Sequence, residues 1–296
     1  MSFLKKIVIG TTKLGMPYGT AQIYQVRKQE VSDIFYQCDK AGLTCFDTAP
    51  SYGTAETLIG KYHKQTLKTQ LVTKLAKLTS PIIDQESINF LQNTFENSLE
   101  KMCIDSCYGL LIHDVSDLYK PNSENLIQWL YDLKNTGRVK KVGVSVYSPS
   151  EVDKLKERFK FDLIQLPCNI FDQRFIESGM LFKLKKMGVE IHARSLFLKG
   201  IILKPNINVG IPNELVEQNI KFYRYLAEKK LLPYDACFQF ANSQKNIDKW
   251  VIGVSKKSHI TQLVGQVEQV LSSNREKLDF ELWSMKKSQN LDPRYW

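Results

Sequence analysis

The feature of this sequence that most constrains its fold is a regular alternation of short apolar runs with amphipathic helical patterns. Alternation of this kind implies parallel strands joined by crossover helices, and eight such units close into a barrel. We therefore expect an α/β fold, a (β/α)8 TIM barrel. Its strands are predicted at residues 7–11, 43–49, 70–76, 107–114, 139–147, 161–169, 189–197 and 250–255. Helices are predicted at residues 30–42, 86–102, 125–137, 180–187, 213–230 and 259–271. Two further helices are predicted to begin at about residue 55 and at residue 148.

No linker or low-complexity segment divides the chain, so residues 1–296 are expected to form a single domain. The segment 198–212 has no clear periodicity and is predicted to be a loop over the barrel mouth. The tail after residue 274 ends in DPRYW. Its aromatic residues favour a tail that is docked on the barrel, and a free tail is the alternative.

The composition excludes several classes of protein. No apolar run reaches the roughly 18 residues of a membrane helix, and the N-terminal MSFLKKIVIG lacks a signal-peptide cleavage site. The six cysteines are scattered, and Cys103 and Cys107 have no second pair to complete a zinc site. We therefore expect no metal, mostly buried thiols, no membrane association and a cytoplasmic location.

The net charge of +10 has two readings. It can reflect a lysine-rich solvated surface, or it can attract an anionic ligand such as a phosphorylated cofactor. A nucleic-acid-binding protein would carry a concentrated basic stripe or a known module, and the sequence shows neither, so no nucleic-acid partner is expected.

Three consecutive predicted strands end in polar side chains. Asp47 ends the second strand, with Tyr52 five residues later; Lys74 belongs to the third strand and His113 ends the fourth. Because active sites of α/β barrels lie at the carboxyl ends of the strands, these four side chains are predicted to meet at one mouth. Each alone has a structural reading, as an ion pair, a buried histidine or loop packing, but their joint occurrence at consecutive strand ends favours chemistry.

These residue types together suit proton delivery. Tyrosine is a poor acid, with an unperturbed pKa of about 10, and an ammonium group beside a phenol favours the phenolate. Lys74 is the candidate ammonium, and Asp47 supplies the counter-charge that a buried lysine needs. His113 is predicted to orient a carbonyl or to share the proton with Tyr52. No side chain provides hydride, so a nicotinamide cofactor is implied.

The stretch GLTCFDTAPSYGTAETLIG at residues 42–60 closely resembles the signature of the aldo-keto reductase family. The resemblance continues through almost the whole chain, in VTKL, LLIHD, VGVSVYS, LIQLPCNIFD and VIGVS. It implies a (β/α)8 barrel, Tyr52 as general acid, Lys74 and Asp47 tuning it, His113 orienting the carbonyl, and NADPH as the usual cofactor, with NADH as the alternative. By the same resemblance, the cofactor-binding positions are Thr11, Ser145, Gln165, Asn169, Arg194, Ser195, Gly253, Ser255, Lys256, Lys257, Gln262 and Gln266.

The sequence departs from the family pattern at two places near the nicotinamide. Val146 stands where many members have Asn, which puts one carboxamide contact in doubt. Arg194 stands where many members have a Tyr that stacks on the nicotinamide. Arg194 can stack in its place, bind an anionic substrate group, or form a structural salt bridge.

The adenine end departs as well. Gln262, Gly265 and Gln266 occupy positions where members often have an Arg and a Glu-Asn pair. Lys256 and Lys257 are candidates for a 2′-phosphate, with Ser258 at the next helix N-terminus, although exposed loop lysines are often only solvated.

We therefore expect an NAD(P)H-dependent reductase of an aldehyde, ketone or sugar carbonyl, with a small-molecule substrate that is a sugar or an anionic compound. Two alternatives stay open: a cofactor-binding regulatory subunit without turnover, and a sugar or alcohol dehydrogenase that works in the oxidative direction. The sequence does not reveal the oligomeric state.

Overall fold

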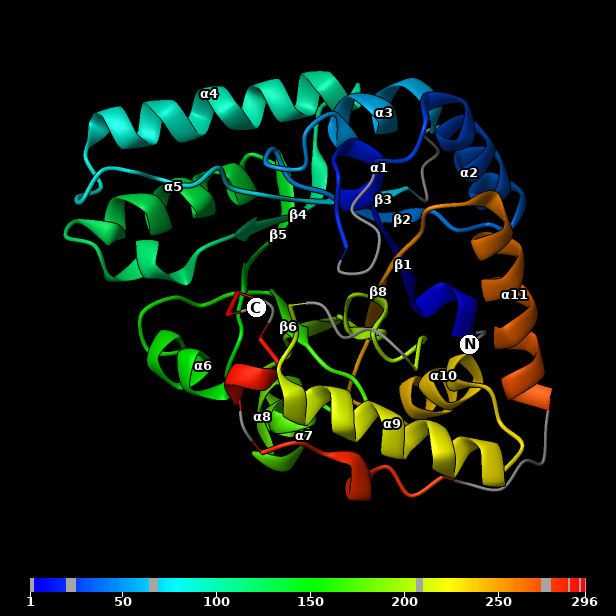
Figure 1. The fold of residues 1–296 in the computed structure, drawn as a ribbon. Helices are drawn as coiled ribbons and strands as arrows, with labels where there is room; N and C mark the ends of the chain where they lie inside the picture. The colour runs from blue at the N-terminus through cyan, green and yellow to red at the C-terminus, as the bar shows by residue number, and fades with distance from the viewer. Residues whose placement is uncertain are drawn as a thin grey trace.

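The computed structural model describes residues 3–19, 25–63, 69–205, 210–272, 278–286, 288–292 and 294–295. Eight parallel strands form a closed barrel in chain order, with β1 paired to both β2 and β8. Helices surround the strands (Figure 1). The predicted (β/α)8 fold is therefore confirmed. The strands are β1 Ile7–Gly10, β2 Cys45–Asp47, β3 Gln70–Lys74, β4 Cys107–Ile112, β5 Val139–Ser145, β6 Leu163–Pro167, β7 Glu190–Arg194 and β8 Lys249–Gly253.

The described part of the chain forms eleven α-helices and five short 3-10 helices. The α-helices are α1 Thr12–Gly15, α2 Lys28–Lys40, α3 Ala55–Tyr62, α4 Gln85–Met102, α5 Ser123–Asn135, α6 Pro149–Leu155, α7 Arg174–Glu177, α8 Met180–Lys186, α9 Asn213–Glu228, α10 Pro233–Ser243 and α11 Lys257–Ser272. The 3-10 helices are η1 Phe3–Lys6, η2 Val115–Tyr119, η3 Leu198–Gly200, η4 Glu281–Trp283 and η5 Ser288–Asn290. None of the described helices is long and apolar enough to cross a membrane.

Local sequence signals set several helix ends. Ser148 and Glu151 form a reciprocal capping box at the start of α6, with Pro149 in the first turn. Gly42 takes a left-handed φ of 67° just past α2, where a residue with a Cβ would be strained. Asp84 accepts a hydrogen bond from the Ser87 backbone at the start of α4.

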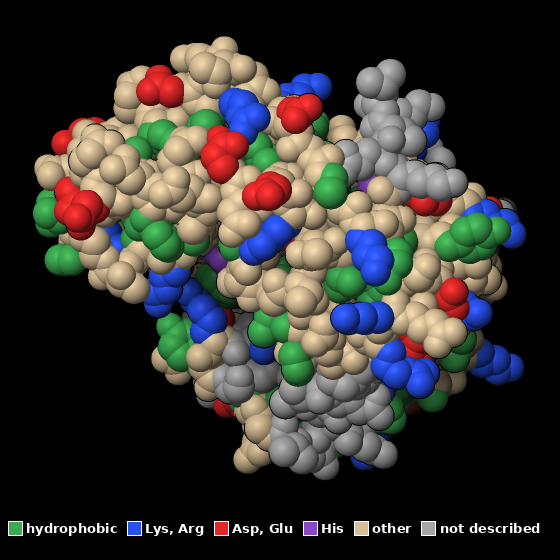
Figure 2. Space-filling view, turned by 90° about the horizontal axis from the view of Figure 1, so that it is seen from above, with side chains coloured by type: hydrophobic (Ala, Val, Ile, Leu, Met, Phe, Trp, Pro, Cys, Tyr) green, Lys and Arg blue, Asp and Glu red, His purple; other side chains and the backbone are tan. Residues whose placement is uncertain are grey.

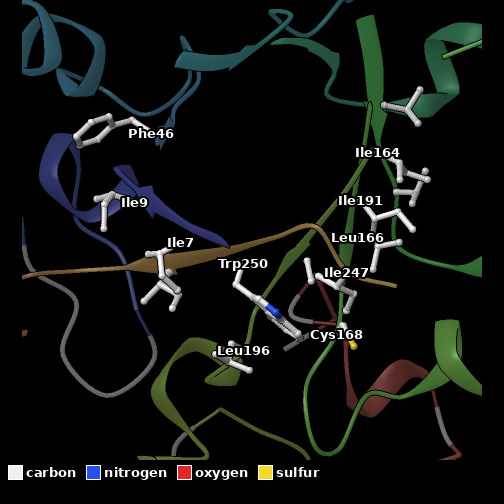
Figure 3. Close-up of a cluster of buried hydrophobic side chains, with 14 of the residues drawn as sticks. Ile7, Ile9, Phe46, Ile164, Leu166, Cys168, Ile191, Leu196, Ile247 and Trp250 are labelled. Atoms are coloured by element: carbon white, nitrogen blue, oxygen red, sulfur yellow. The ribbon is translucent and has the colours of Figure 1, made fainter. Parts of the chain in front are cut away.

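The main core lies between the strands and the helices that cover them. Buried side chains from β1, β2, β6, β7 and β8 pack in this layer, and Trp250 of β8 is fully buried among them (Figure 3). Burial of such side chains supplies most of the stabilisation of the fold. The residues drawn in this layer include Ile7, Ile9, Phe46, Ile164, Leu166, Ile191 and Ile247.

The barrel interior is arranged in layers, because alternate residues of each strand face inward. Lys74, Gln165 and Arg194 reach the layer at the carboxyl ends of the strands. A separate, fully buried apolar cluster consists of Val72 on β3, Leu111 on β4 and Leu163 on β6. Val72 and Leu163 each lie two positions before a residue of the mouth layer, Lys74 and Gln165 respectively. Nearer the amino ends lies a charged cluster around Glu190.

The surface carries basic and acidic side chains that are interspersed over the face seen in Figure 2, without a single basic stripe. This distribution supports the reading of a lysine-rich solvated surface on that face. All six cysteines carry free thiols, and five of them are buried whereas Cys103 is exposed. The prediction that most of the thiols are buried is confirmed.

Candidate active site

Lys74, the last residue of β3, is fully paired inside the barrel mouth. Its Nζ donates hydrogen bonds to both carboxylate oxygens of Asp47, at 2.8 and 2.9 Å, and to the carbonyl oxygen of Thr48 at 2.8 Å. Burial lowers the pKa of Lys74, but the charges of Asp47 and Tyr52 outweigh it and hold that pKa above its usual value. The side chain is therefore an ammonium at neutral pH.

Tyr52 lies beside this ammonium, in the loop between β2 and α3. The Nζ of Lys74 lies 4.9 Å from the centroid of the Tyr52 ring, and the phenol interacts with Lys74 through its hydroxyl. Tyr52 also lines the cavity at the barrel mouth. The phenol, the ammonium and the Asp47 carboxylate therefore form one coupled group, as the sequence predicted.

Two glycines hold the loop that carries Tyr52. A Cβ on Gly15 would lie 2.0 Å from the Tyr52 carbonyl oxygen and 2.4 Å from the Ala55 nitrogen, so only glycine fits there. Gly53 has a left-handed φ of 59°, and the Thr54 nitrogen donates to the Gly15 carbonyl at 3.1 Å. Sequence reasoning missed this backbone-to-backbone contact because the two segments are far apart along the chain.

His113 faces Tyr52 across the site. The two rings lie 6.2 Å apart between centroids and are almost perpendicular. Burial, followed by the charge of Lys74, lowers the pKa of His113 to about 4. The imidazole is therefore neutral at physiological pH and has one N–H to donate.

Gln165 adds a second partner to the Asp47 carboxylate. Its Nε2 donates to Asp47 Oδ1 at 2.7 Å, and the side chain is buried at the cavity wall. The family resemblance implied a contact of Gln165 with the nicotinamide carboxamide. In this structure, the amide Nε2 helps to hold Asp47 in place, and the contact with the carboxamide stays a prediction.

A single cavity of about 620 Å³ contains the four candidate catalytic side chains. Its wall includes most of the positions that the resemblance assigned to the cofactor. The segment after β7 also lines it, and the left-handed backbone of Ser195, Leu198 and Lys199 gives this loop a strained conformation. The expected loop over the barrel mouth is thus present, and residues 206–209 of it lie outside the described residues. The assigned positions in the wall are Ser145, Gln165, Arg194, Ser195, Gly253, Ser255, Lys256 and Gln262.

Four assigned positions lie outside the cavity wall. Thr11 is fully buried and its Oγ1 donates to the Asp47 carbonyl oxygen at 2.9 Å, so it supports the site from behind. Lys257 is exposed and pairs with Asp33 at 3.3 Å. Gln266 has a buried Oε1 that finds no hydrogen-bond partner among the described residues.

Asn169 is the fourth, and the structure gives it a structural role. It is fully buried, its Nδ2 donates to the Ser195 carbonyl at 3.1 Å, and its Oδ1 accepts from the backbone nitrogens of Phe171 and Asp172. The backbone thus occupies both ends of the amide in this structure, and the assignment of Asn169 to the cofactor stays a prediction.

The far end of the cavity is basic. Lys13 and His259, which the sequence did not single out, line it together with Lys256. Burial lowers the pKa of His259, and the charges of Lys256 and Lys13 lower it further. Gly253 leaves this part open, because a Cβ there would meet nothing within 4 Å.

These residues fit a nicotinamide dinucleotide. One end of the cavity has the proton-delivering group and the polar side chains of Ser145 and Gln165, whereas the other end has two lysines that suit phosphate groups. Among the residues described, no three side chains gather as a potential metal site.

Comparisons with known proteins agree with this geometry. The model of the aldo/keto reductase family matches residues 6–277. The chain is similar to aldo-keto reductase YhdN of Bacillus subtilis (strain 168), with 26% identity over 180 residues, and this match spans 58% of the chain and about half, 53%, of that relative.

Two solved structures show the same fold at low identity. Aldo-keto reductase AKR11C1 from Bacillus halodurans, in its holo form, has a TM-score of 0.73 and 16% identity over 97% of this chain and 91% of that one. Glycerol dehydrogenase AKR11B4 from Gluconobacter oxydans has a TM-score of 0.64 and 17% identity over 93% of this chain and 94% of that one.

Fold and site together define a barrel enzyme with acid–base groups at the carboxyl ends of its strands. Because the family model covers nearly the whole sequence, the chain belongs to the aldo-keto reductase family, whose members are NAD(P)-dependent oxidoreductases.

Proposed function

We propose that this protein is an NADPH-dependent reductase of small carbonyl compounds with Tyr52 as its general acid. The observation that carries the proposal is the buried ammonium of Lys74, which is held by Asp47 and lies against the Tyr52 ring. A positive charge in this place stabilises the phenolate that is left when Tyr52 gives up its proton.

The other side chains orient the substrate. The neutral His113 donates a hydrogen bond to the carbonyl oxygen and places it within reach of the Tyr52 hydroxyl. Gln165 and Lys74 together fix the Asp47 carboxylate, so the ammonium keeps its position while the proton moves. When bound, the reduced nicotinamide supplies the hydride that reaches the carbonyl carbon.

The basic end of the cavity favours NADPH over NADH. Lys13 and Lys256 line it, and a 2′-phosphate adds negative charge where these ammonium groups lie. Ser145 is the candidate partner of the nicotinamide carboxamide, while Ser255 and Gln262 lie with the lysines at the other end.

The oxidative direction is a second candidate. The fold neighbour from Gluconobacter oxydans is named a glycerol dehydrogenase, and the same side chains serve both directions because Tyr52 acts as acid in one and as base in the other. The intact group of Asp47, Tyr52, Lys74 and His113 favours turnover over a purely regulatory subunit.

The test is turnover of a panel of aldehydes and ketones with NADPH, measured as the loss of the reduced-nicotinamide absorbance. We expect Tyr52→Phe to lower kcat by about 100- to 10,000-fold, the usual contribution of a general acid. Binding of NADPH and NADH, measured by fluorescence titration, should stay near the wild-type values, with NADPH the tighter ligand.

Tyr36→Phe is the matched control, because Tyr36 lies exposed on α2, away from the cavity. It should keep wild-type turnover. Unchanged turnover in Tyr52→Phe would remove the assigned acid. Tight NADPH binding without reduction of any carbonyl compound would instead point to the regulatory subunit.

A further inference from the structure

The cavity wall near the catalytic residues carries an arginine that is stacked on a tyrosine. Arg194 ends β7, and its guanidinium carbon lies 4.1 Å from the centroid of the Tyr147 ring. Its Nη2 donates to the Val146 carbonyl oxygen at 3.1 Å. The stack and the hydrogen bond fix the plane of this guanidinium, which prepares it for a planar or tetrahedral oxyanion.

A second guanidinium stacks on the same tyrosine. That of Arg294 lies 3.5 Å from the Tyr147 centroid, and two guanidinium groups are too wide to share one face of a ring, so Tyr147 lies between them. Arg294 is held by Asp292 through hydrogen bonds of 2.6–3.0 Å. The buried Leu291 and Asp292 dock this tail.

Several charged groups gather at this wall. Burial lowers the pKa of Lys199, and the charge of Asp292 opposes this effect. Burial raises the pKa of Asp292, but hydrogen bonds from Arg294 and the charge of Arg194 outweigh it and lower that pKa. The charge of Glu151 acts on Arg294 as well. Within the described residues, no carboxylate lies within 4 Å of Arg194.

Asp172 does not neutralise Arg194 either. It senses the charge of Arg194, but both of its carboxylate oxygens accept hydrogen bonds from Arg174 at 2.8 Å. A bidentate pair of this kind already satisfies the aspartate.

This charge acts directly on the chemical centre. Arg194 contributes to the lowered pKa of His113, after burial and Lys74. Burial raises the pKa of Tyr18, and this phenol is also influenced by Tyr52 and Arg194, so Tyr18 lies within reach of both. Arg194, Tyr52 and His113 line the same cavity, so an anionic group bound at Arg194 would share that cavity with a carbonyl group beside Tyr52.

We propose that Arg194, supported by Tyr147, forms a subsite for an oxyanion of the substrate. The preferred substrates are then carbonyl compounds that carry a carboxylate or phosphate group near the reacting carbon. This inference rests on the proposed reductase function and names the substrate class of the same site.

The experiment compares matched pairs of charged and neutral substrates at low ionic strength. The pairs are succinic semialdehyde with butanal, and glyceraldehyde phosphate with glyceraldehyde. We expect the wild-type kcat/KM to favour at least one charged member by about tenfold or more, since hydrogen bonds to charged groups contribute about 1.5–3 kcal/mol. The pair that shows the preference tells carboxylate from phosphate.

Arg194→Gln should lower the ratio of kcat/KM for the charged substrate to kcat/KM for its neutral partner by about 10- to 100-fold. Arg194→Tyr should do the same, because it keeps an aromatic surface for the nicotinamide but removes the charge. Lys40→Gln, which removes an exposed charge at the end of α2, is the control and should change neither value.

Other outcomes would overturn the subsite. Equal losses for charged and neutral substrates in Arg194→Gln, with weaker NADPH binding, would assign Arg194 to the cofactor. A wild-type enzyme without preference for either charged member would also overturn it, while the reductase function would stand.

If the wild-type protein reduces none of these compounds, the result contradicts the proposed function. The oxyanion subsite is then tested by a binding measurement. Succinate and inorganic phosphate are titrated into the protein by calorimetry. Binding of one of them that is lost in Arg194→Gln and kept in Lys40→Gln supports the subsite. Absence of binding in the wild type, or equal binding in Arg194→Gln, overturns it.

Discussion

The protonation state of His113 is set by its neighbours rather than by the intrinsic chemistry of imidazole. A free histidine has a pKa of about 6.5, whereas burial and the charge of Lys74 lower the pKa of His113 to about 4. A neutral imidazole can donate to a carbonyl oxygen but has no extra proton to share. Of the two roles that the sequence left open, the structure therefore favours orientation of the carbonyl over proton sharing with Tyr52.

We expect the His113 ring to titrate near pH 4 when followed by NMR. Between about pH 4 and 6.5 the folded protein then binds fewer protons at His113 than the unfolded chain does, so this group makes the free energy of unfolding fall as the pH falls through that window. His113→Phe should reduce the fall, as measured by urea unfolding at about pH 4.5 and 7. A ring midpoint above pH 6 would contradict the assignment.

Single residues also show what sequence could and could not supply. Asp47, Tyr52, Lys74 and His113 were predictable because each follows a recognisable strand and parallel strands bring their carboxyl ends together. The hydrogen bonds that the amides of Gln165 and Asn169 make to Asp47 and to the backbone could not be predicted. The direction of a side-chain amide depends on neighbours far along the chain, and no local pattern records them.

At the scale of elements, the contact between α1 and the loop before α3 positions the acid. Gly15 at the end of α1 touches the backbone of Tyr52, and Gly53 takes a conformation that other residues adopt at a cost. The loop is held by these backbone contacts and by the Thr54 hydroxyl, which donates to the Gly15 carbonyl oxygen at 3.3 Å. A methyl group at Gly15 would push the Tyr52 loop away from Lys74.

Gly15→Ala should lower kcat by about 10- to 100-fold through displacement of Tyr52, because a misplacement of about 1 Å carries a penalty of that order. It should also lower the midpoint of thermal unfolding. Gly137→Ala is the control: its left-handed φ of 75° strains an alanine, but a Cβ there meets nothing within 4 Å and the residue lies between α5 and β5, away from the cavity, so turnover should not change. Wild-type kcat in Gly15→Ala would show that the loop is held by other contacts.

Helix α10 is the longest helix that the sequence did not reveal, beside the one-turn helices α1 and α7. It lies between the predicted helix at 213–230 and the last strand, and begins with Pro233. Its side chains are buried on several sides, so no polar stripe alternates with an apolar one and the helical period is hidden. The tail shows a similar limit: Leu291 and Asp292 dock it, whereas the aromatic Tyr295 is exposed and Trp296 lies outside the described residues.

At the scale of the whole molecule, the barrel has charged groups at both of its ends. At the amino-terminal end, Glu190 forms an ion pair with Lys141 and accepts a hydrogen bond from the Tyr108 hydroxyl at 2.6 Å. The Nε2 of His192 lies 2.7 Å from its other oxygen. Burial raises the pKa of Glu190, but hydrogen bonds from His192, Lys141 and Tyr108 hold it well below its usual range.

We expect Glu190→Gln to lower the free energy of unfolding by about 2–3 kcal/mol at pH 7, because it leaves partly buried donors and a cation without their partner. The pKa of Glu190 is depressed in the folded state, so its contribution is present above the unfolded value of about 4.3 and is lost at lower pH. The difference from wild type in urea unfolding should therefore shrink at about pH 3. Tyr108→Phe, which removes one hydrogen bond, should have a smaller effect, and a constant difference at both pH values would contradict this account.

The apolar layer of Val72, Leu111 and Leu163 separates these two charged ends. These three side chains have no polar atoms, so a proton cannot pass through them from one end to the other. The fully buried His192, which lies on β7 between Glu190 and Arg194, is a polar group that borders both ends. Changes among the ions at the floor of the barrel should therefore act mainly on how long the enzyme survives heat or acid, which gives natural selection or an engineer a way to vary durability away from the reacting groups.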